Sequence, residues 1–454
     1  MSHSDAFWDR MGREADPLAD RTVAAIVGPW SDVAGAMDPG MARLGQATRL
    51  MAGWTTNASL TSWTAGPGTD PAVAAALRAY LDAGSGLPDW SRPADIERAE
   101  DVFMEYGPLS CTLLFCASLP QCYVLPHLAE VLHIAGQLEA HTEHRIRQTA
   151  AMVFPLMMKG GLASAAGGGV AQVLKVRLIH ATVRHLILRG APQDASGRIE
   201  PQAGAGSANL HRALVSHGWD VERQGLPCSQ LELAYTLLTF GYVFLKGMRD
   251  LGTPLSPQQE IAYLHAWNVA GHVLGIRDDL MAHTMEEAAA MFDRIQAMAR
   301  DQQPSPDDRP GLGRALMDTM ARAIRLPVVR HLPVPLTRWL IGADTARRIG
   351  TNERIGLAAW LLFRVGFALV RVADGIVRLA VPRFSLARMF TRVIGYHLLK
   401  RLLLDQTRRL GLPQELLQPL HDTVGAWHED AKAPRWVNRL EDRLTTVGAW
   451  RPRP

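Results

Sequence analysis

The chain has 454 residues, of which 48% are hydrophobic and 20% are charged. This composition allows a large buried core and excludes a disordered chain, and the length allows one large domain or up to about three. The net charge of +4 comes from scattered basic residues and does not indicate a nucleic-acid partner.

The first twenty residues contain no basic stretch followed by an apolar one. We therefore predict no secretory or twin-arginine signal and expect a cytoplasmic protein. No run of 18 uncharged apolar residues predicts an ordinary membrane-spanning helix. The four cysteines form no CxxC pair and are expected to be buried thiols. Because strand-like alternation is rare and helical periodicity is common, the sequence predicts an all-α protein.

One possible metal motif precedes the central helices. Glu130 and His133 form an ExxH pair, which is the pattern of di-iron helix bundles. Such a site needs a second ExxH pair and two further glutamates, and we find only one pair. His265 and His272, seven residues apart on one helix face, offer no third ligand. A non-haem di-iron bundle therefore stays an alternative.

A polar trio follows in the segment HRIRQTAAMVF. Arg145, Gln148 and Thr149 stand at positions i, i+3 and i+4, so they share one face of a helix. A cation, an amide and a hydroxyl beside apolar residues suit a pocket that steers a small ligand such as dioxygen. The alternative is a solvated helix face.

The segment LKVRLIHATVRHLILR, residues 174–189, carries apolar residues on nearly every face of a helix and is predicted to be buried. His180 lies in its middle, with Arg177 one turn before it and Arg184 one turn after it. Burial favours the neutral imidazole, which is the form that binds haem iron or zinc. The two arginines are placed to pair with the carboxylates of a bound cofactor. The alternative is a histidine of the core.

The second half contains two capping boxes that predict helix starts, Ser229–Glu232 and Ser256–Gln259. The first opens a helix that is predicted to run through SQLELAYTLLTFGYVFLKGMRD and to stop at Gly252. A glycine-rich break at residues 160–169 separates the helix of Arg145 from that of His180. His217, Trp219 and Asp220 precede this half, and no physical argument places them at a site.

Three regions are predicted. Residues 1–100 form a helical extension on a core of residues 101–303, a linker spans Pro304–Gly313, and residues 314–454 form a C-terminal helical region. In residues 355–404, a row of arginines recurs every seven residues on an apolar helix: Arg364, Arg371 and Arg378. Such a row suits peripheral membrane contact, and a core helix with its arginines in water is the alternative.

Several of these stretches together resemble the latex-clearing-protein (rubber oxygenase) and MpaB-like oxygenase family. They are SLPQCYVLPHLAEVLHIAGQL, RIRQTA, MKGGLASAAGGG, VRLIHATVRHLI, GLPCSQLELAYTLLTFGYVFLKGMRDLG and AYLHAWNVAGHVLGIRDDLM, between about residues 101 and 291. The resemblance implies a globin-like helical core around one haem b, with His180 as the iron ligand. It places Arg145 and Thr149 on the distal side, where they donate hydrogen bonds to dioxygen, and Glu130 as the base.

The resemblance also has two departures. Gln148 stands where the family's rubber oxygenases have a lysine that caps the iron, so we expect the sixth position to be open or held by water. The missing export signal favours a smaller or membrane-dissolved substrate over an extracellular polymer.

The predicted function is a haem b-dependent oxygenase that uses O2 to oxidise or cleave C=C bonds of an apolar, isoprenoid-like substrate. The alternatives are a terpenoid side-chain or peroxygenase-type reaction on the same fold, and a non-catalytic haem or lipid carrier at a membrane surface.

Overall fold

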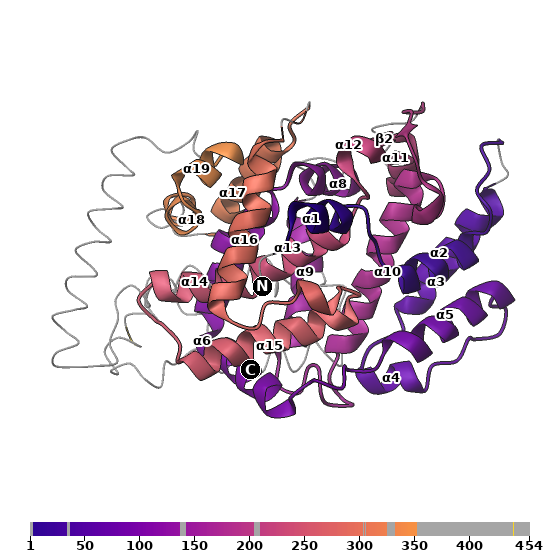
Figure 1. Ribbon diagram of the computed structural model, residues 1–454. Helices are drawn as coiled ribbons and strands as arrows, with labels where there is room; N and C mark the ends of the chain where they lie inside the picture. The colour runs from indigo at the N-terminus through magenta and orange to yellow at the C-terminus, as the bar shows by residue number, and fades with distance from the viewer. Residues whose placement is uncertain are drawn as a thin grey trace, which may run out of the picture.

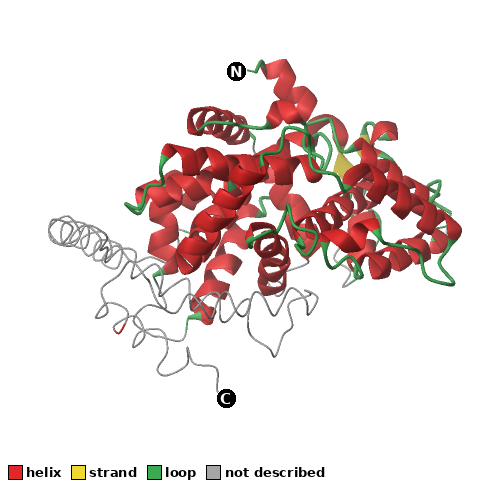
Figure 2. Ribbon diagram, turned by 90° about the horizontal axis from the view of Figure 1, so that it is seen from below, coloured by secondary structure: helices red, strands yellow, loops and turns green. Residues whose placement is uncertain are grey.

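The protein is mostly helical, as the sequence predicts (Figure 2). The computed structural model describes residues 3–33, 37–136, 142–203, 209–302, 304, 306–324, 332–351 and 439. Its described residues contain one small sheet, in which β1 (Arg198–Ile199) pairs antiparallel with β2 (Trp219–Asp220). The four cysteines are buried free thiols, as predicted.

The helices follow in three stretches along the chain. The first stretch holds α1 (Asp5–Met11), α2 (Pro17–Val27), α3 (Asp38–Met51), α4 (Asn57–Thr61) and α5 (Pro71–Gly84). The second holds α6 (Pro93–Leu113), a π-helical turn (Leu114–Ser118), α7 (Leu119–Cys122), α8 (Pro126–Gly136), α9 (Thr142–Met157) and α10 (Gly169–Leu188). The third holds α11 (Leu210–Ser216), α12 (Val221–Gln224), α13 (Gln230–Phe240), α14 (Tyr242–Asp250), α15 (Pro257–Val273), α16 (Met285–Arg300), α17 (Arg309–Ala323), α18 (Pro333–Ile341) and α19 (Ala343–Arg348). Short 3-10 turns lie at Pro192–Asp194 and Asp278–Leu280.

Helix α10 lies between the group of α2, α3, α4 and α5 and the other labelled helices (Figure 1). On one side it packs against α2 and α4, which belong to the group formed by α2, α3, α4 and α5. On the other side it packs against α9, α11 and α15, and α15 in turn packs along α6. The predicted burial of the helix around His180 is confirmed. The structure adds that α10 joins α2–α5 to the rest of the described helices.

The predicted capping boxes both form, because the side chains of Ser229 and Ser256 accept hydrogen bonds from the backbone three residues later. The helix that begins after Ser229 is not continuous, however. It divides at Gly241 into α13 and α14, where the residue's ψ of −74° lies well away from the ideal helical value. Glycine weakens a helix at an interior position, which explains the break that the apolar periodicity did not predict.

Helix α6 crosses the boundary that the sequence predicted at residues 100 and 101. Within the described residues, the continuous run Pro93–Cys122 is the one helix long and apolar enough to span a membrane. Its most apolar window is 83% buried inside the protein, as in the core helix of a folded domain. The run bends at Gly107, whose φ is 21°, immediately before Pro108.

The predicted linker is wrong in its second part, because α17 begins at Arg309 and packs against α8 and α9. Pro310 lies in the first turn of α17, where its missing N–H costs no helical hydrogen bond. The arginine row at residues 355–404 lies outside the described residues.

Candidate functional site

The glycine-rich break places α10 against α9 through a tightly packed turn. Asn57 organises this turn: its Nδ2 donates to the carbonyls of Gly161 (2.9 Å) and Ser164 (2.8 Å), and its Oδ1 accepts from the N–H of Val170 (3.1 Å) at the start of α10. A Cβ on Gly167 would lie 2.1 Å from the carbonyl oxygen of Gly160. The glycines are therefore required for the close approach that sets where α10 begins.

His180 is a neutral imidazole on α10. Burial, followed by the positive charge of Arg184, lowers its pKa to about 4. Its Nδ1 is buried and has no hydrogen-bond partner among the described residues, while the residue as a whole is partly exposed. Its neighbour Ile179 is 49% exposed, which is unusual on so buried a helix. The ring therefore has one enclosed nitrogen, and Nε2 is the nitrogen that can accept a ligand bond.

His185, on the same helix, differs from His180. Burial also lowers the pKa of His185 to about 4, but both of its ring nitrogens are enclosed without a partner among the described residues. Its ring packs edge-on against Trp30, with 6.1 Å between ring centroids. The described surroundings thus give His185 the setting of a core residue and leave His180 as the better metal ligand.

Arg177 and Arg184 bind protein carboxylates. The Nε and Nη2 of Arg177 donate to the two carboxylate oxygens of Asp16 at 2.5 and 2.7 Å. The Nε of Arg184 donates to Asp20 Oδ1 at 3.1 Å. Both guanidinium groups are buried in these pairs, so the carboxylates that they bind belong to the protein itself and not to a cofactor.

The polar trio lies on α9, which packs against α10. Thr149 is partly exposed and Gln148 is exposed, while the side chain of Arg145 lies outside the described residues. Sequence reasoning did not single out Arg147, which is buried and whose Nη2 lies 3.4 Å from Glu143 Oε1. The distal roles expected for Arg145, Gln148 and Thr149 stay predictions.

Glu130 lies on α8 at the centre of a hydrogen-bonded cluster. Its Oε1 is 2.8 Å from His217 Nε2, and its Oε2 accepts from Gln224 Nε2 at 2.6 Å. His127, one turn before it, is 3.8 Å from Oε2. Burial alone would raise the pKa of Glu130, but hydrogen bonds with His127 and His217 outweigh it and lower the pKa to about 2. His217, noted in the sequence without a role, is therefore a direct partner of Glu130.

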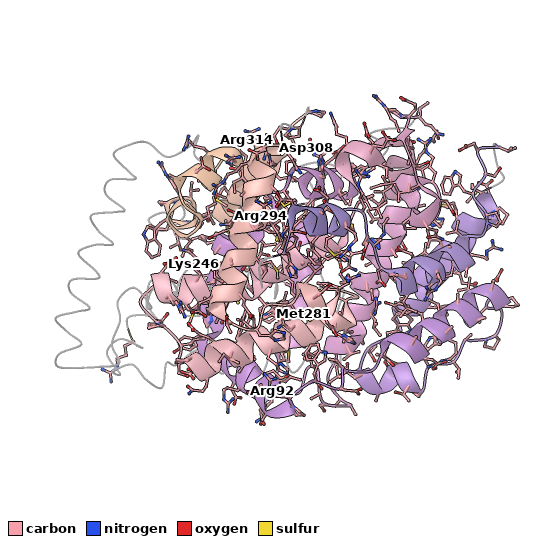
Figure 3. The ribbon with its side chains drawn as sticks, viewed as in Figure 1. Arg92, Lys246, Met281, Arg294, Asp308 and Arg314 are labelled. Carbon is pink, nitrogen blue, oxygen red and sulfur yellow. The ribbon has the colours of Figure 1, made fainter. Side chains whose placement is uncertain are left out.

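The histidine of the ExxH pair, His133, does not share the partners of Glu130. His133 Nδ1 lies 3.7 Å from Asp308 Oδ1, just before α17, and Figure 3 shows Asp308 at the upper edge of the molecule. Burial raises the pKa of Asp308, and His133 opposes this effect. Among the described residues no group of three or more histidine, cysteine or acidic side chains is arranged to hold a metal ion. This part of the chain gives the di-iron alternative no support.

In the other histidine pair, His265 and His272, one ring nitrogen of each residue also has a partner within the protein. His265 Nε2 accepts a hydrogen bond from the backbone N–H of Arg92 at 2.8 Å, which uses the lone pair that a metal would need. His272 Nδ1 lies 3.1 Å from Asp278 Oδ1. The rings of His265 and His272 both pack edge-on against Trp90. We therefore interpret this pair as structural.

Glu130 is expected to make stability depend on acid pH. Its folded pKa of about 2 lies below the usual 4.5, so its contribution is present above pH 4.5 and is lost as the pH falls towards 2. The lost contribution is up to about 3 kcal/mol. In urea unfolding between pH 3 and 7, the wild type should lose more stability on acidification than Glu130→Gln. The exposed Glu97→Gln is the control, and equal losses in wild type and Glu130→Gln would contradict the assignment.

Comparison with known proteins gives the family. Residues 112–372, more than half of the chain, match the family described as the catalytic domain of ER-bound oxygenase mpaB/B' and rubber oxygenase. The chain belongs to this family. The match confirms the predicted resemblance and continues past residue 303, where the sequence placed the end of the core.

Two members show how far the similarity extends. The chain is 26% identical over 310 residues to the rubber oxygenase of Streptomyces sp. (strain K30), an alignment that covers 66% of each protein and so slightly less than two thirds of that relative. A solved structure of latex clearing protein in the closed state superposes with a TM-score of 0.61 at 19% identity, over 85% of this chain and 91% of that one. This structural likeness shows that the mpaB/rubber-oxygenase family member described here has the latex-clearing-protein fold.

Proposed function

We propose that the chain is a haem b-dependent oxygenase that uses dioxygen to oxidise or cleave C=C bonds of an apolar, isoprenoid-like compound. The family match supports the oxygenase class. The observation that carries the proposal is His180, a neutral imidazole in the middle of the central helix, with only one ring nitrogen enclosed.

The residues around His180 fit a haem group. A neutral imidazole is the form that binds haem iron, and burial keeps His180 in that form well below neutral pH. Val176 and Val183, one turn before and one turn after it, share its face of α10 and are apolar. Bound haem would supply the redox centre that activates dioxygen.

The chain's own residues would then hold and orient the reactants. In this proposal His180 would hold the iron through Nε2, and Arg145 and Thr149 on α9 would donate hydrogen bonds to dioxygen. Such donors stabilise negative charge as it develops on oxygen. Gln148 lacks the amine with which a lysine could bind iron, so it would leave the iron accessible to dioxygen or water.

Glu130 is proposed as the group that takes up an allylic proton. A carboxyl group with a pKa of about 2 is a weak base near neutral pH, because the best general bases have pKa values close to the working pH. The role therefore requires that His217, 2.8 Å away, shares the proton that arrives on Glu130.

The proposal is tested by oxygen uptake with a matched pair of substrates. The relative in Streptomyces is named a rubber oxygenase, so a short cis-polyisoprene and farnesyl compounds are the first substrates to try. Squalene and squalane share one carbon skeleton, but squalane has no double bond. We expect uptake and carbonyl products with the unsaturated compounds alone. A haem-loaded protein that consumes no oxygen with any alkene would contradict the proposal and favour a haem or lipid carrier.

A further inference from the structure

The N-terminal helix α2 is joined to α10 by two buried ion pairs on either side of His180. Asp16 and Asp20 lie one turn apart at the start of α2, and each binds one of the arginines that flank the histidine. The guanidinium group of Arg184 is fully buried, and Arg177 and both aspartates are less than 10% exposed. Isolated charges are rarely buried in this way, so the two pairs are a built feature of the fold.

Each arginine also binds the end of a third helix. Arg177 Nη1 donates to the carbonyl of Val273, at the end of α15, at 3.0 Å. Arg184 Nη1 donates to the carbonyl of Cys228, just before α13, at 3.0 Å. Three elements distant in the sequence therefore meet at each guanidinium group, and α10 cannot slide or rotate without breaking several charge-assisted hydrogen bonds.

The ion pair between Asp16 and Arg177 is tightly packed on both sides. Gly275, which has a φ of +89°, approaches so closely that a Cβ there would lie 2.5 Å from Asp16 Oδ2 and 2.7 Å from Arg177 Nε. Gln230 closes the other side, because its Nε2 donates to the carbonyls of Ala15 and Gly275, both at 2.8 Å. The N-terminal segment is thus held in one register on the helix that carries His180.

The pairs also set the charge near His180. The positive charge of Arg184 lowers the pKa of His180, and the negative charge of Asp16 raises it. Two guanidinium groups within a turn of an iron ligand would favour the less positive, reduced state of the iron. The two aspartates compensate these charges at contact distance.

We propose that Asp16 and Asp20 are positioning residues for His180, which hold its helix and compensate the charges of Arg177 and Arg184. The proposal rests on the proposed function, since it assumes that His180 binds haem. Both aspartates precede residue 112, where the match to the family domain begins. In this proposal the N-terminal extension therefore helps to hold the helix that carries His180.

The test uses the full-length, haem-loaded protein and three acid-to-amide variants. Asp16→Asn and Asp20→Asn remove one compensating charge each, and the exposed Asp9→Asn in α1 is the matched control. We expect the reduction potential of the haem to become more positive in the first two variants, with an altered Soret position. Asp9→Asn should match the wild type, and Asp20→Glu, which restores the charge, should return towards it.

The outcomes distinguish a failure of the positioning role from a failure of the proposed function. Folded, haem-loaded Asp16→Asn and Asp20→Asn with the potential and spectrum of Asp9→Asn would overturn the positioning role and leave a purely structural one. Where Asp20→Asn yields no folded protein, Asp16→Asn against Asp9→Asn carries the same comparison. A wild type that binds no haem would instead contradict the proposed function.

Discussion

Replacing His180 with alanine is expected to abolish haem retention. The imidazole is neutral at physiological pH, because burial and the charge of Arg184 lower its pKa to about 4, so it requires no deprotonation before it binds iron. His185, the other histidine of α10, offers no open ring nitrogen, since both of its nitrogens are enclosed. The purified variant should show no Soret band and no stoichiometric iron.

Two controls make this experiment decisive. His185→Ala removes a histidine with a similarly lowered pKa from the same helix, and it should keep its haem although it loses some stability. Added imidazole should restore a Soret band in His180→Ala, because it can replace the missing ligand. Full haem content in His180→Ala without added imidazole would remove His180 from the site.

Replacing Arg184 with alanine is expected to cost about 3–5 kcal/mol of unfolding free energy, which is the usual cost of removing one partner of a buried ion pair. The change leaves the Asp20 carboxylate and the carbonyl of Cys228 without their donor in a fully buried position. Urea unfolding at pH 7 measures this loss. The exposed pair Arg198–Glu200 provides the control, and Arg198→Ala should cost less than about 1 kcal/mol.

The pH dependence of the Arg184 variant gives a second check. Burial raises the pKa of Asp20 to about 6 even with Arg184 beside it, so the carboxyl group is readily protonated below that pH. Once neutral, Asp20 no longer requires the guanidinium charge. The destabilisation caused by Arg184→Ala should therefore be smaller at pH 5 than at pH 7, and an equal or larger loss at pH 5 would contradict this account of the pair.

The local features of α10 and of the capped helices were predictable from sequence, because they depend on residues within a turn or two of each other. The burial of α10 follows from apolar residues on nearly every face, and the helix starts at Ser229 and Ser256 follow from their capping boxes. The break at Gly241 was not predictable from the apolar pattern, which continues unchanged through it.

The partners of the site residues were not predictable in the same way. Arg177 and Asp16 are separated by 161 residues, so nothing in the spacing around His180 indicates whether its arginines meet a cofactor or a distant helix. Glu130 and His217 are separated by 87 residues. Long-range contacts of this kind are set by how helices pack, which one sequence without its fold leaves open.

The element boundaries show a third limit. The segment PSPDDRPGLG has the composition of a linker, yet its second part forms the first turn of α17. Proline and glycine are typical of loops, but proline is equally common in the first turn of a helix. The distinction depends on whether an apolar face follows and finds a partner, and α17 packs against α8 and α9.

The most direct test of the central claim is the absorption spectrum of the purified wild-type protein, ferric and dithionite-reduced, together with iron analysis. If His180 holds a haem, the spectrum should show a Soret band and the analysis about one iron per chain. The ferrous spectrum then shows whether the position opposite His180 is open. A colourless protein that gains no Soret band when hemin is added would contradict the claim. His180 would then be a core histidine on a latex-clearing-protein fold that binds no haem.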